Sequence, residues 1–163
     1  SKDHPKTVLR IAECWLNENK QNSTWIVKHG LRSLLKQAHP KALELFGYGN
    51  PKAIEIIGLE LSTHKPAMGD TFQFQFELNN PKGKHQKLRL EYLIDFKKKN
   101  GSSKKVFQLS EFVLGGNSSK SFVKKHSFQE LTTRKHYPGI HMLSIRLNGL
   151  VINTVEFNLI KGD

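Results

Sequence analysis

Residues 143–159 read LSIRLNGLVINTVEFNL, with apolar side chains at alternate positions on both sides of Asn148-Gly149, apart from Asn153. A period of two places alternate side chains on one face of a β-strand. Asn-Gly between two such runs is the strongest short-range signal for a two-residue hairpin, because both turn positions need a positive φ. This stretch therefore predicts two antiparallel strands joined by a tight turn.

The period of two continues upstream, so residues 51–163 are predicted to form an all-β domain. Further strands are expected over residues 53–61, 72–78, 88–96, 106–114 and 121–128, separated by segments rich in Gly, Asn, Ser and Pro. About seven short strands in roughly 100 residues are typical of an antiparallel immunoglobulin-like β-sandwich. The Cys…Trp…Cys core of antibody domains is absent from the sequence, so the prediction concerns the architecture alone.

Residues 1–50 have the period of an α-helix instead. The sequence predicts one helix that opens at Pro5, a second that is capped by Asn22 or Ser23, and a short third that begins at Pro40. Apolar residues recur in them at i, i+3, i+4 and i+7, so each helix has one apolar face. The expected organisation is multidomain, α then all-β, with the boundary near residue 50.

A short repeat links the predicted helices. His4-Pro5-Lys6 recurs as His39-Pro40-Lys41, 35 residues later, and opens a helix each time. Helical-pair repeats have periods of about 34–47 residues. We interpret residues 1–50 as the terminal HEAT-like repeat of an α-solenoid, with a chance match as the alternative. The chain begins with Ser1 rather than Met, which fits a piece of a longer protein.

The charge balance favours a polyanionic partner. The 163 residues carry 26 Lys and Arg against 14 Asp and Glu, a formal net charge of +12. From Lys97 to His136, nine lysines and one arginine stand against two glutamates. The densest stretch, KKKNGSSKK over residues 97–105, is expected to be an exposed hairpin tip. Double-stranded DNA is the simplest partner for such a chain, although a charge run can also be only a solvated surface.

The predicted DNA-binding residues fall into two groups. On the second helix, a spacing of four places three cations in one row. The helical group is Lys28, His29, Arg32 and Lys36. The sandwich group is Lys97, Lys98, Lys99, Lys104, Lys105, Lys124, Lys125, Arg134 and Lys135.

Several other function classes have no support in the sequence. No apolar run is long enough to cross a membrane and the start of the chain has no secretory signal, so we expect a cytoplasmic protein. GxSxG, Walker and HExxH motifs are absent, and we expect neither a metal nor another cofactor. The single cysteine, Cys14, excludes an intrachain disulfide. Cys14 and Trp25 are both expected in the helical core.

The helical part resembles a known family. Residues 1–5 with a helix ending in Trp15-Leu16, the block TWIVKHGLRSLLK over residues 24–36, and HPKALELFGY over residues 39–48 resemble the last helical repeats of AlkC/AlkD-type DNA alkylation repair proteins. An immunoglobulin-like domain after such repeats points to the AlkC branch. The residues of the sandwich add no motif of their own to this resemblance.

The resemblance implies a monofunctional DNA glycosylase that excises cationic N3-alkylated bases from double-stranded DNA. It implies a basic solenoid face that holds the duplex, and a carboxylate that supports the oxocarbenium-like sugar or its attacking water. The main catalytic acid is then expected upstream of Ser1, and Asp3 is the candidate within this chain. Neither a membrane nor a protein partner is expected.

Two further hypotheses stay open. The first is a non-enzymatic, basic immunoglobulin-like interaction module behind a helical scaffold. The second is an extracellular sandwich that binds acidic glycans, which the absence of a signal and of disulfides disfavours. Helical pairs upstream, with an inward-facing carboxylate and aromatic residues, would favour the enzyme over the binding module.

Overall fold

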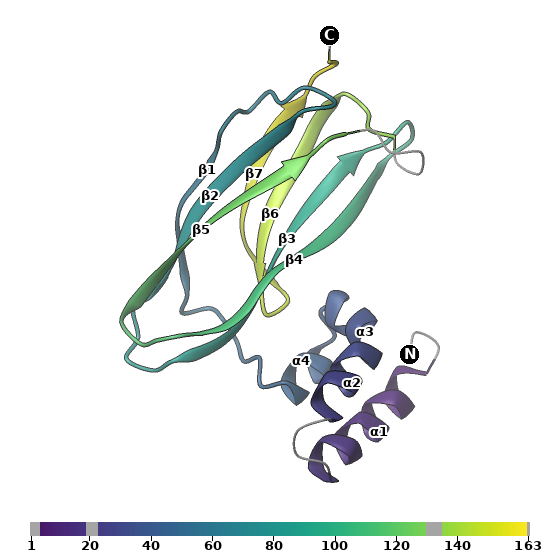
Figure 1. The fold of residues 1–163 in the computed structure, drawn as a ribbon, viewed down its shortest axis with the longest axis vertical. Coiled ribbons are helices and arrows are strands. Elements are labelled where there is room, and N and C mark those ends of the chain that lie inside the picture. Colours follow the sequence, from purple (N-terminus) through teal and green to yellow (C-terminus); the bar gives the residue numbers. More distant parts are fainter. Residues whose placement is uncertain (1–3, 19–22, 130–134, 163) are drawn as a thin grey trace.

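The computed structural model describes residues 4–18, 23–129 and 135–162, and in this part of the chain four helices precede seven strands (Figure 1). The helices are α1 (Pro5–Glu18), α2 (Ser23–Gly30), α3 (Arg32–Lys36) and α4 (Pro40–Leu45). The strands are β1 (Glu55–Leu61), β2 (Thr71–Asn80), β3 (Gln86–Lys97), β4 (Ser102–Leu114), β5 (Ser118–Ser127), β6 (Gly139–Leu147) and β7 (Leu150–Leu159). The predicted order of helices followed by antiparallel strands is confirmed.

The strands form two antiparallel sheets that face each other. One sheet has the order β1-β2-β5 and the other β4-β3-β6-β7. Leu147 pairs with Leu150 across the β6–β7 turn, where Asn148 and Gly149 have φ values of 44° and 85°. The Asn-Gly hairpin predicted from the sequence is therefore confirmed.

The core of the sandwich comes from the inward-facing side chains of both sheets. Phe72, Phe74 and Phe76 of β2 are at most 3% exposed, and the rings of Phe72 and Phe74 meet Phe157 and Tyr92 of the opposite sheet. Alternation along each strand sends these large side chains to one face, where their burial from water stabilises the packing of the sheets. The outer face of the β4-β3-β6-β7 sheet is left to meet the helices.

The helices form a second cluster of buried side chains, built around Leu31, Leu34, Leu35 and Ala42. The predicted second helix is divided at Leu31, whose φ of −92° and ψ of 2° depart from helical values. Backbone hydrogen bonds from Leu31 N–H to the Val27 carbonyl and from Leu35 N–H to the Leu31 carbonyl still cross the division. The row of cations on this segment therefore stays on one side.

Two residues expected in the helical core are exposed instead. Cys14 is exposed, and Trp25 is 72% exposed. Each lies two positions from a buried residue of its own helix, Ala12 in α1 and Val27 in α2. Two positions correspond to about 200° around a helix, so these side chains point away from the core. No helix in the described part of the chain is long and apolar enough to span a membrane.

Candidate nucleic-acid interface

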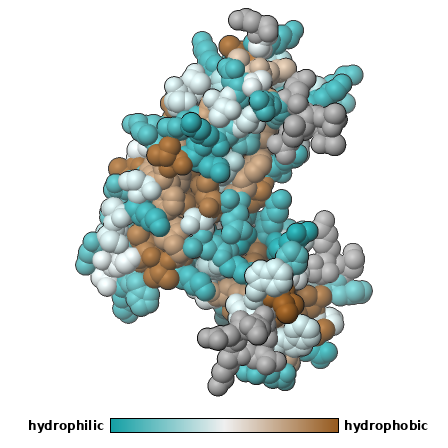
Figure 2. All heavy atoms as spheres, in the orientation of Figure 1, coloured by the Kyte–Doolittle hydropathy of each residue, from teal (hydrophilic) through white to brown (hydrophobic). Residues whose placement is uncertain are grey.

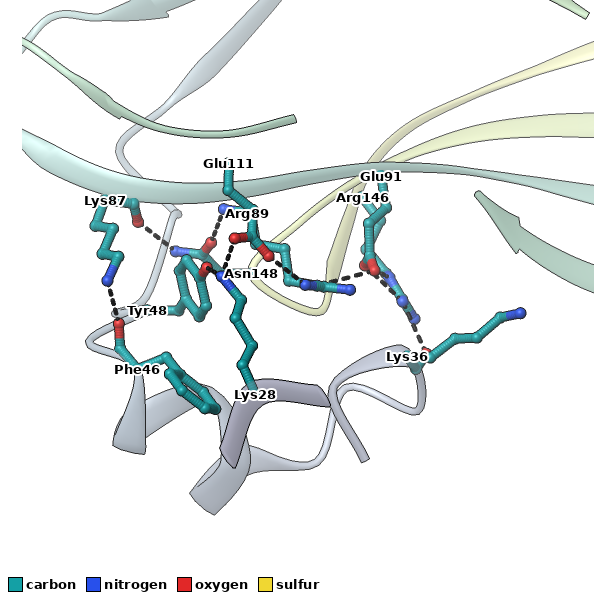
Figure 3. Close-up of polar contacts among 10 residues, drawn as sticks. All are labelled: Lys28, Lys36, Phe46, Tyr48, Lys87, Arg89, Glu91, Glu111, Arg146 and Asn148. Atoms are coloured by element: carbon teal, nitrogen blue, oxygen red, sulfur yellow. Dashed lines mark hydrogen bonds and ion pairs between the residues drawn. The ribbon is translucent and has the colours of Figure 1, made fainter. Parts of the chain in front are cut away.

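The helices and the sandwich are joined by hydrogen bonds that run from sandwich side chains to carbonyl oxygens of the helical part (Figure 3). Arg146 Nη2 donates to the Lys36 carbonyl at 2.9 Å, and Lys87 Nζ donates to the Phe46 carbonyl at 2.7 Å. Lys36 ends α3, and Phe46 is the C-cap of α4. Carbonyls at helix C-termini lack intrahelical donors and carry partial negative charge, so cationic side chains suit them.

A chain of alternating charges lies at this junction. Glu91, whose side chain is 1% exposed, accepts hydrogen bonds from Arg89 Nε at 3.0 Å and from Arg146 Nε at 2.8 Å. Glu111 on β4 accepts from Arg89 Nη1 and from Lys28 Nζ of α2. Buried charges are stable only when they are paired and hydrogen-bonded, so this network ties α2 to the outer face of β3 and β4.

The electrostatic environment of Glu111 shows that the network favours its charged form. Burial alone would raise the pKa of Glu111, but the hydrogen bond and charge of Lys28, with smaller contributions from Tyr48 and Arg89, hold that pKa below its usual value. The pKa of the neighbouring Tyr48 is raised, first by burial and then by the Glu111 carboxylate. Glu111 is therefore an ion-pair partner in this structure and has no spare proton to donate.

The β6–β7 turn is the second point of attachment. Asn148 Nδ2 donates to the Gly49 carbonyl at 2.8 Å, and Asn148 Oδ1 accepts from the Arg89 backbone N–H at 2.7 Å. A Cβ on Gly149 would lie 2.8 Å from the Ala38 Cβ and 2.9 Å from the Leu43 Cδ1. The turn therefore packs so closely on the helical cluster that only glycine fits.

Between the two attached parts the molecule is hollowed, as Figure 2 shows. Two adjoining hollows, of about 200 Å³ and about 690 Å³, share the lining residues Arg32, Arg89 and Gln108. Trp25 and His29 line the smaller hollow, and Lys36 lines the larger one. We call the two hollows together the cleft; its walls are α2 and α3 on one side and the outer face of β3 and β4 on the other.

The structure brings the helical group of predicted DNA-binding residues to this cleft. His29, Arg32 and Lys36 are exposed there. Lys28 also lines the cleft, but its ammonium group is paired with Glu111 and donates to the Tyr48 hydroxyl at 3.3 Å. Exposed cations at a concave surface suit the phosphates of a nucleic acid.

The sandwich group of predicted residues lies elsewhere. Five of its nine residues lie in the β3–β4 turn and in the strand ends beside it, at the end of the sandwich away from the helices (Figure 1). The Lys98 backbone N–H donates to the Gly101 carbonyl at 3.0 Å and closes this turn, and Lys98 Nζ lies 6.0 Å from the centre of the Tyr137 ring. Lys97, Lys99, Lys104, Lys124, Lys125 and Lys135 are exposed, and Lys105 is half-buried. Asp3 and Arg134 lie outside the described residues.

The sequence pattern does not reveal the sandwich side of the cleft. Arg89, Glu91 and Arg146 stand at outward-facing positions of strands, where polar residues normally meet water. Gln108 has no sequence signal at all. Nothing in a period of two reveals that helices will cover that face, so these residues emerge only from the tertiary arrangement.

Comparisons with known proteins agree with this architecture. Residues 55–161 match the family described as "Uncharacterised protein YhaZ, C-terminal Ig-like domain", and the chain belongs to this family. It is 38% identical over 160 residues to the uncharacterized protein YhaZ of Bacillus subtilis (strain 168), an alignment that covers 98% of this chain and 44% of YhaZ.

A solved structure resembles both parts of the chain together. It is the alkylpurine DNA glycosylase AlkC of Pseudomonas fluorescens bound to DNA containing an abasic site analog, with a TM-score of 0.90 and 36% identity over 97% of this chain and 44% of AlkC. The predicted relationship to AlkC-like proteins with an immunoglobulin-like domain is thereby confirmed. The chain spans less than half the length of these relatives.

A third match covers a smaller share of the chain. A β-glucosidase of Listeria innocua is 11% identical with a TM-score of 0.54, over 65% of this chain and 16% of the enzyme. At that identity the likeness concerns architecture and says nothing of chemistry.

Proposed function

We propose that this chain is the DNA-holding part of an AlkC-like alkylation-repair glycosylase, whose helices form the terminal HEAT-like repeat of a solenoid. The observation that carries the proposal is the match to DNA-bound AlkC, which extends over the helices and the sandwich at once with a TM-score of 0.90. A single superposition of that quality requires that the two parts be placed relative to each other as in AlkC. The cleft between them is then part of a shared arrangement.

The cleft offers the electrostatics that duplex binding needs. Arg32 and Lys36 are exposed at its helical wall, and the network at its floor has three cations for two carboxylates. Phosphate neutralisation by such side chains releases counter-ions and supplies sequence-independent affinity. The residues proposed to contact phosphate are His29, Arg32 and Lys36, while Lys28 serves the junction.

The reaction proposed for the whole protein is excision of cationic N3-alkylated bases. A base that already carries positive charge is a good leaving group, so the enzyme needs a carboxylate to stabilise the sugar cation more than a strong acid. The carboxylates that line the cleft, Glu91 and Glu111, are both paired with cations. We therefore place the catalytic carboxylate outside these two residues, in a part of the protein beyond the described residues.

A second candidate function is a non-enzymatic interaction module that binds DNA. The pairing of Glu91 and Glu111 with cations favours it, because neither carboxylate is free for catalysis. A glycosylase assay on methylated duplex distinguishes the two. The 163-residue chain should release no N3-methyladenine above a protein-free control, and a longer protein with upstream helices should release it. If the longer protein binds duplex but excises nothing, the non-enzymatic module is the better description.

DNA binding itself is tested by titrating labelled duplex at several salt concentrations. Arg32→Ser with Lys36→Ser should weaken binding and reduce the slope of log K against log salt by about one unit for each phosphate that is no longer neutralised. The matched control is Lys6→Ser with Lys41→Ser, which removes two exposed cations that line a separate groove between α1 and α4. An equal decrease in affinity from both pairs would contradict the cleft as the binding surface.

A further inference from the structure

Trp25 is the most exposed large apolar side chain in the described part of the chain, at 72%, and its ring packs on the ring of a neighbouring residue. It stacks on His29, one helical turn further along α2, with ring centroids 5.5 Å apart and planes inclined by 19°. An exposed indole costs free energy in water that covering it would recover. The pair therefore presents a flat, preorganised aromatic surface.

The residues around this aromatic surface indicate which kind of ligand it binds. Trp25 and His29 line the smaller hollow together with Arg32 and, on the opposite wall, Gln108 of β4. Aromatic faces beside cations are the combination with which proteins hold unstacked bases, because the ring stacks on the base while the cations meet the backbone. An amide such as that of Gln108 carries both donors and an acceptor, which suits the edge of a base.

We propose that the Trp25–His29 pair is a stacking platform for a nucleobase that has lost its partner or its neighbour in the duplex. In intact duplex both faces of every base are covered by adjacent bases, so an aromatic ring finds a free face only where a base is missing or displaced. This inference rests on the proposed function, since the cleft must first hold DNA for a base to reach the platform. It adds a preference for damaged over intact duplex within the chain itself.

The test uses the intrinsic fluorescence of Trp25. The chain has two tryptophans, so Trp15→Phe leaves Trp25 as the single reporter. This variant is titrated with an intact duplex and with the same duplex carrying an abasic site opposite an unpaired base. The duplex with the abasic site should quench the Trp25 emission and bind about tenfold more tightly, which lies within the range that base–aromatic stacking provides.

Substitutions at Trp25 distinguish a loss of base stacking from a loss of folding and from a loss of phosphate contacts. Trp25→Leu should abolish the preference between the two duplexes, while Trp25→Phe should keep most of it because a phenyl ring still stacks. Ile26→Ala is the matched control, since Ile26 is also exposed on α2, at 52%, but does not line the cleft. Circular dichroism melting checks that each variant folds.

The outcomes distinguish this inference from the proposed function. Three outcomes would contradict the stacking platform: equal affinity for the two duplexes, unchanged Trp25 emission on binding, or a preference that survives Trp25→Leu. In each case the proposed phosphate contacts of the cleft would still hold. If the chain binds neither duplex at any salt concentration, the proposed function fails and the platform fails with it.

Discussion

The carboxylate of Glu91 is the most deeply buried charge among the ion pairs described at the junction, with 1% of its side chain exposed. It accepts hydrogen bonds from Arg89 on its own strand and from Arg146 on the neighbouring strand β6. Arg146 in turn donates to the last carbonyl of α3. One side chain therefore holds both arginines in the orientation that attaches the helices.

Neutralising that carboxylate should destabilise the chain strongly. Glu91→Gln leaves the buried guanidinium group of Arg146 without a carboxylate partner and leaves Arg89 with Glu111 alone. Breaking a buried pair in this way costs about 3–5 kcal/mol. Urea unfolding measures the decrease in stability, with Glu60→Gln on the exposed face of β1 as a control expected to stay within about 0.5 kcal/mol. Adding Arg146→Met should recover part of the stability, because it removes one unpaired charge. Equal stabilities of Glu91→Gln and Glu60→Gln would contradict this role.

His141 gives a second prediction at the scale of one residue. Its ring is neutral in the structure, because Nε2 donates to the Tyr137 carbonyl at 2.9 Å while Nδ1 accepts from the Lys97 backbone N–H at 3.3 Å. Burial lowers the pKa of His141 below the usual 6.5; the hydrogen bond to Tyr137 and the charge of Asp95 oppose this shift, and the charges of Lys97 and Lys98 add to it. Protonation of His141 at Nδ1 would break the hydrogen bond that this atom accepts from the Lys97 backbone N–H.

The pH dependence follows from the sign of that shift. The unfolded chain binds a proton at His141 near pH 6.5 and the folded chain only at lower pH, so the stability contributed by neutral His141 is lost as the pH falls below about 6.5. Urea unfolding between about pH 8 and pH 5 should show a smaller decrease for His141→Gln than for the wild-type chain. The lowered pKa of Glu111 acts separately, since its stabilisation is lost only below its usual value of 4.5. Identical pH profiles for the two proteins would contradict the prediction.

At the scale of elements, the β6–β7 turn acts as the docking point between the sandwich and the helices. Its glycine has a φ of 85° and lies against Ala38 and Leu43. The β3–β4 turn offers a natural comparison, because Gly101 has a similar φ of 78° but nothing within 4 Å of the position of its Cβ.

Gly149→Ala should therefore cost more than Gly101→Ala. Both substitutions carry the strain of a positive φ, of order 1–3 kcal/mol, but only the first also overpacks the junction, at a further cost of about 1–3 kcal/mol. Urea unfolding gives the difference, and hydrogen exchange at α3 and α4 should show reduced protection in Gly149→Ala alone. Equal destabilisation of the two variants would mean that the turn contributes no specific packing.

Elements whose signal is local can be predicted from the sequence, and features that depend on tertiary contact cannot. Asn148-Gly149 marks a hairpin by backbone conformation alone, but its packing on Ala38 depends on helices more than 100 residues away in the chain. The spacing of the cations of α2 and α3 identifies them as one row, whereas the pairing of Lys28 with Glu111 requires the fold. The expectation that Trp25 lies in the core is wrong because apolar composition does not say which side of a helix a residue takes.

At the scale of the whole molecule, the predicted cations form two groups rather than one patch. Strand β4 connects the two groups: it begins with Ser102 at the β3–β4 turn, which we call the basic turn, and nine residues later Glu111 contacts α2. A strand rises by about 3.3 Å per residue, so the cleft and the turn are separated by roughly 30 Å. A straight duplex touching both must extend about nine base pairs between them, at about 3.4 Å for each pair.

Duplex length therefore tests whether the two groups grip one DNA molecule. Replacing Lys98, Lys99, Lys104 and Lys105 by Ser should lower affinity for a duplex of about 30 base pairs and reduce its salt slope by about two to four units. The same variant should bind a duplex of about 10 base pairs like the wild-type chain, because a short duplex centred on the cleft does not reach the turn. Arg32→Ser with Lys36→Ser should weaken binding of both lengths. If the quadruple variant keeps the wild-type salt slope on the long duplex, the basic turn lies outside the DNA-binding surface. DNA binding would then depend on the cleft and not on this turn.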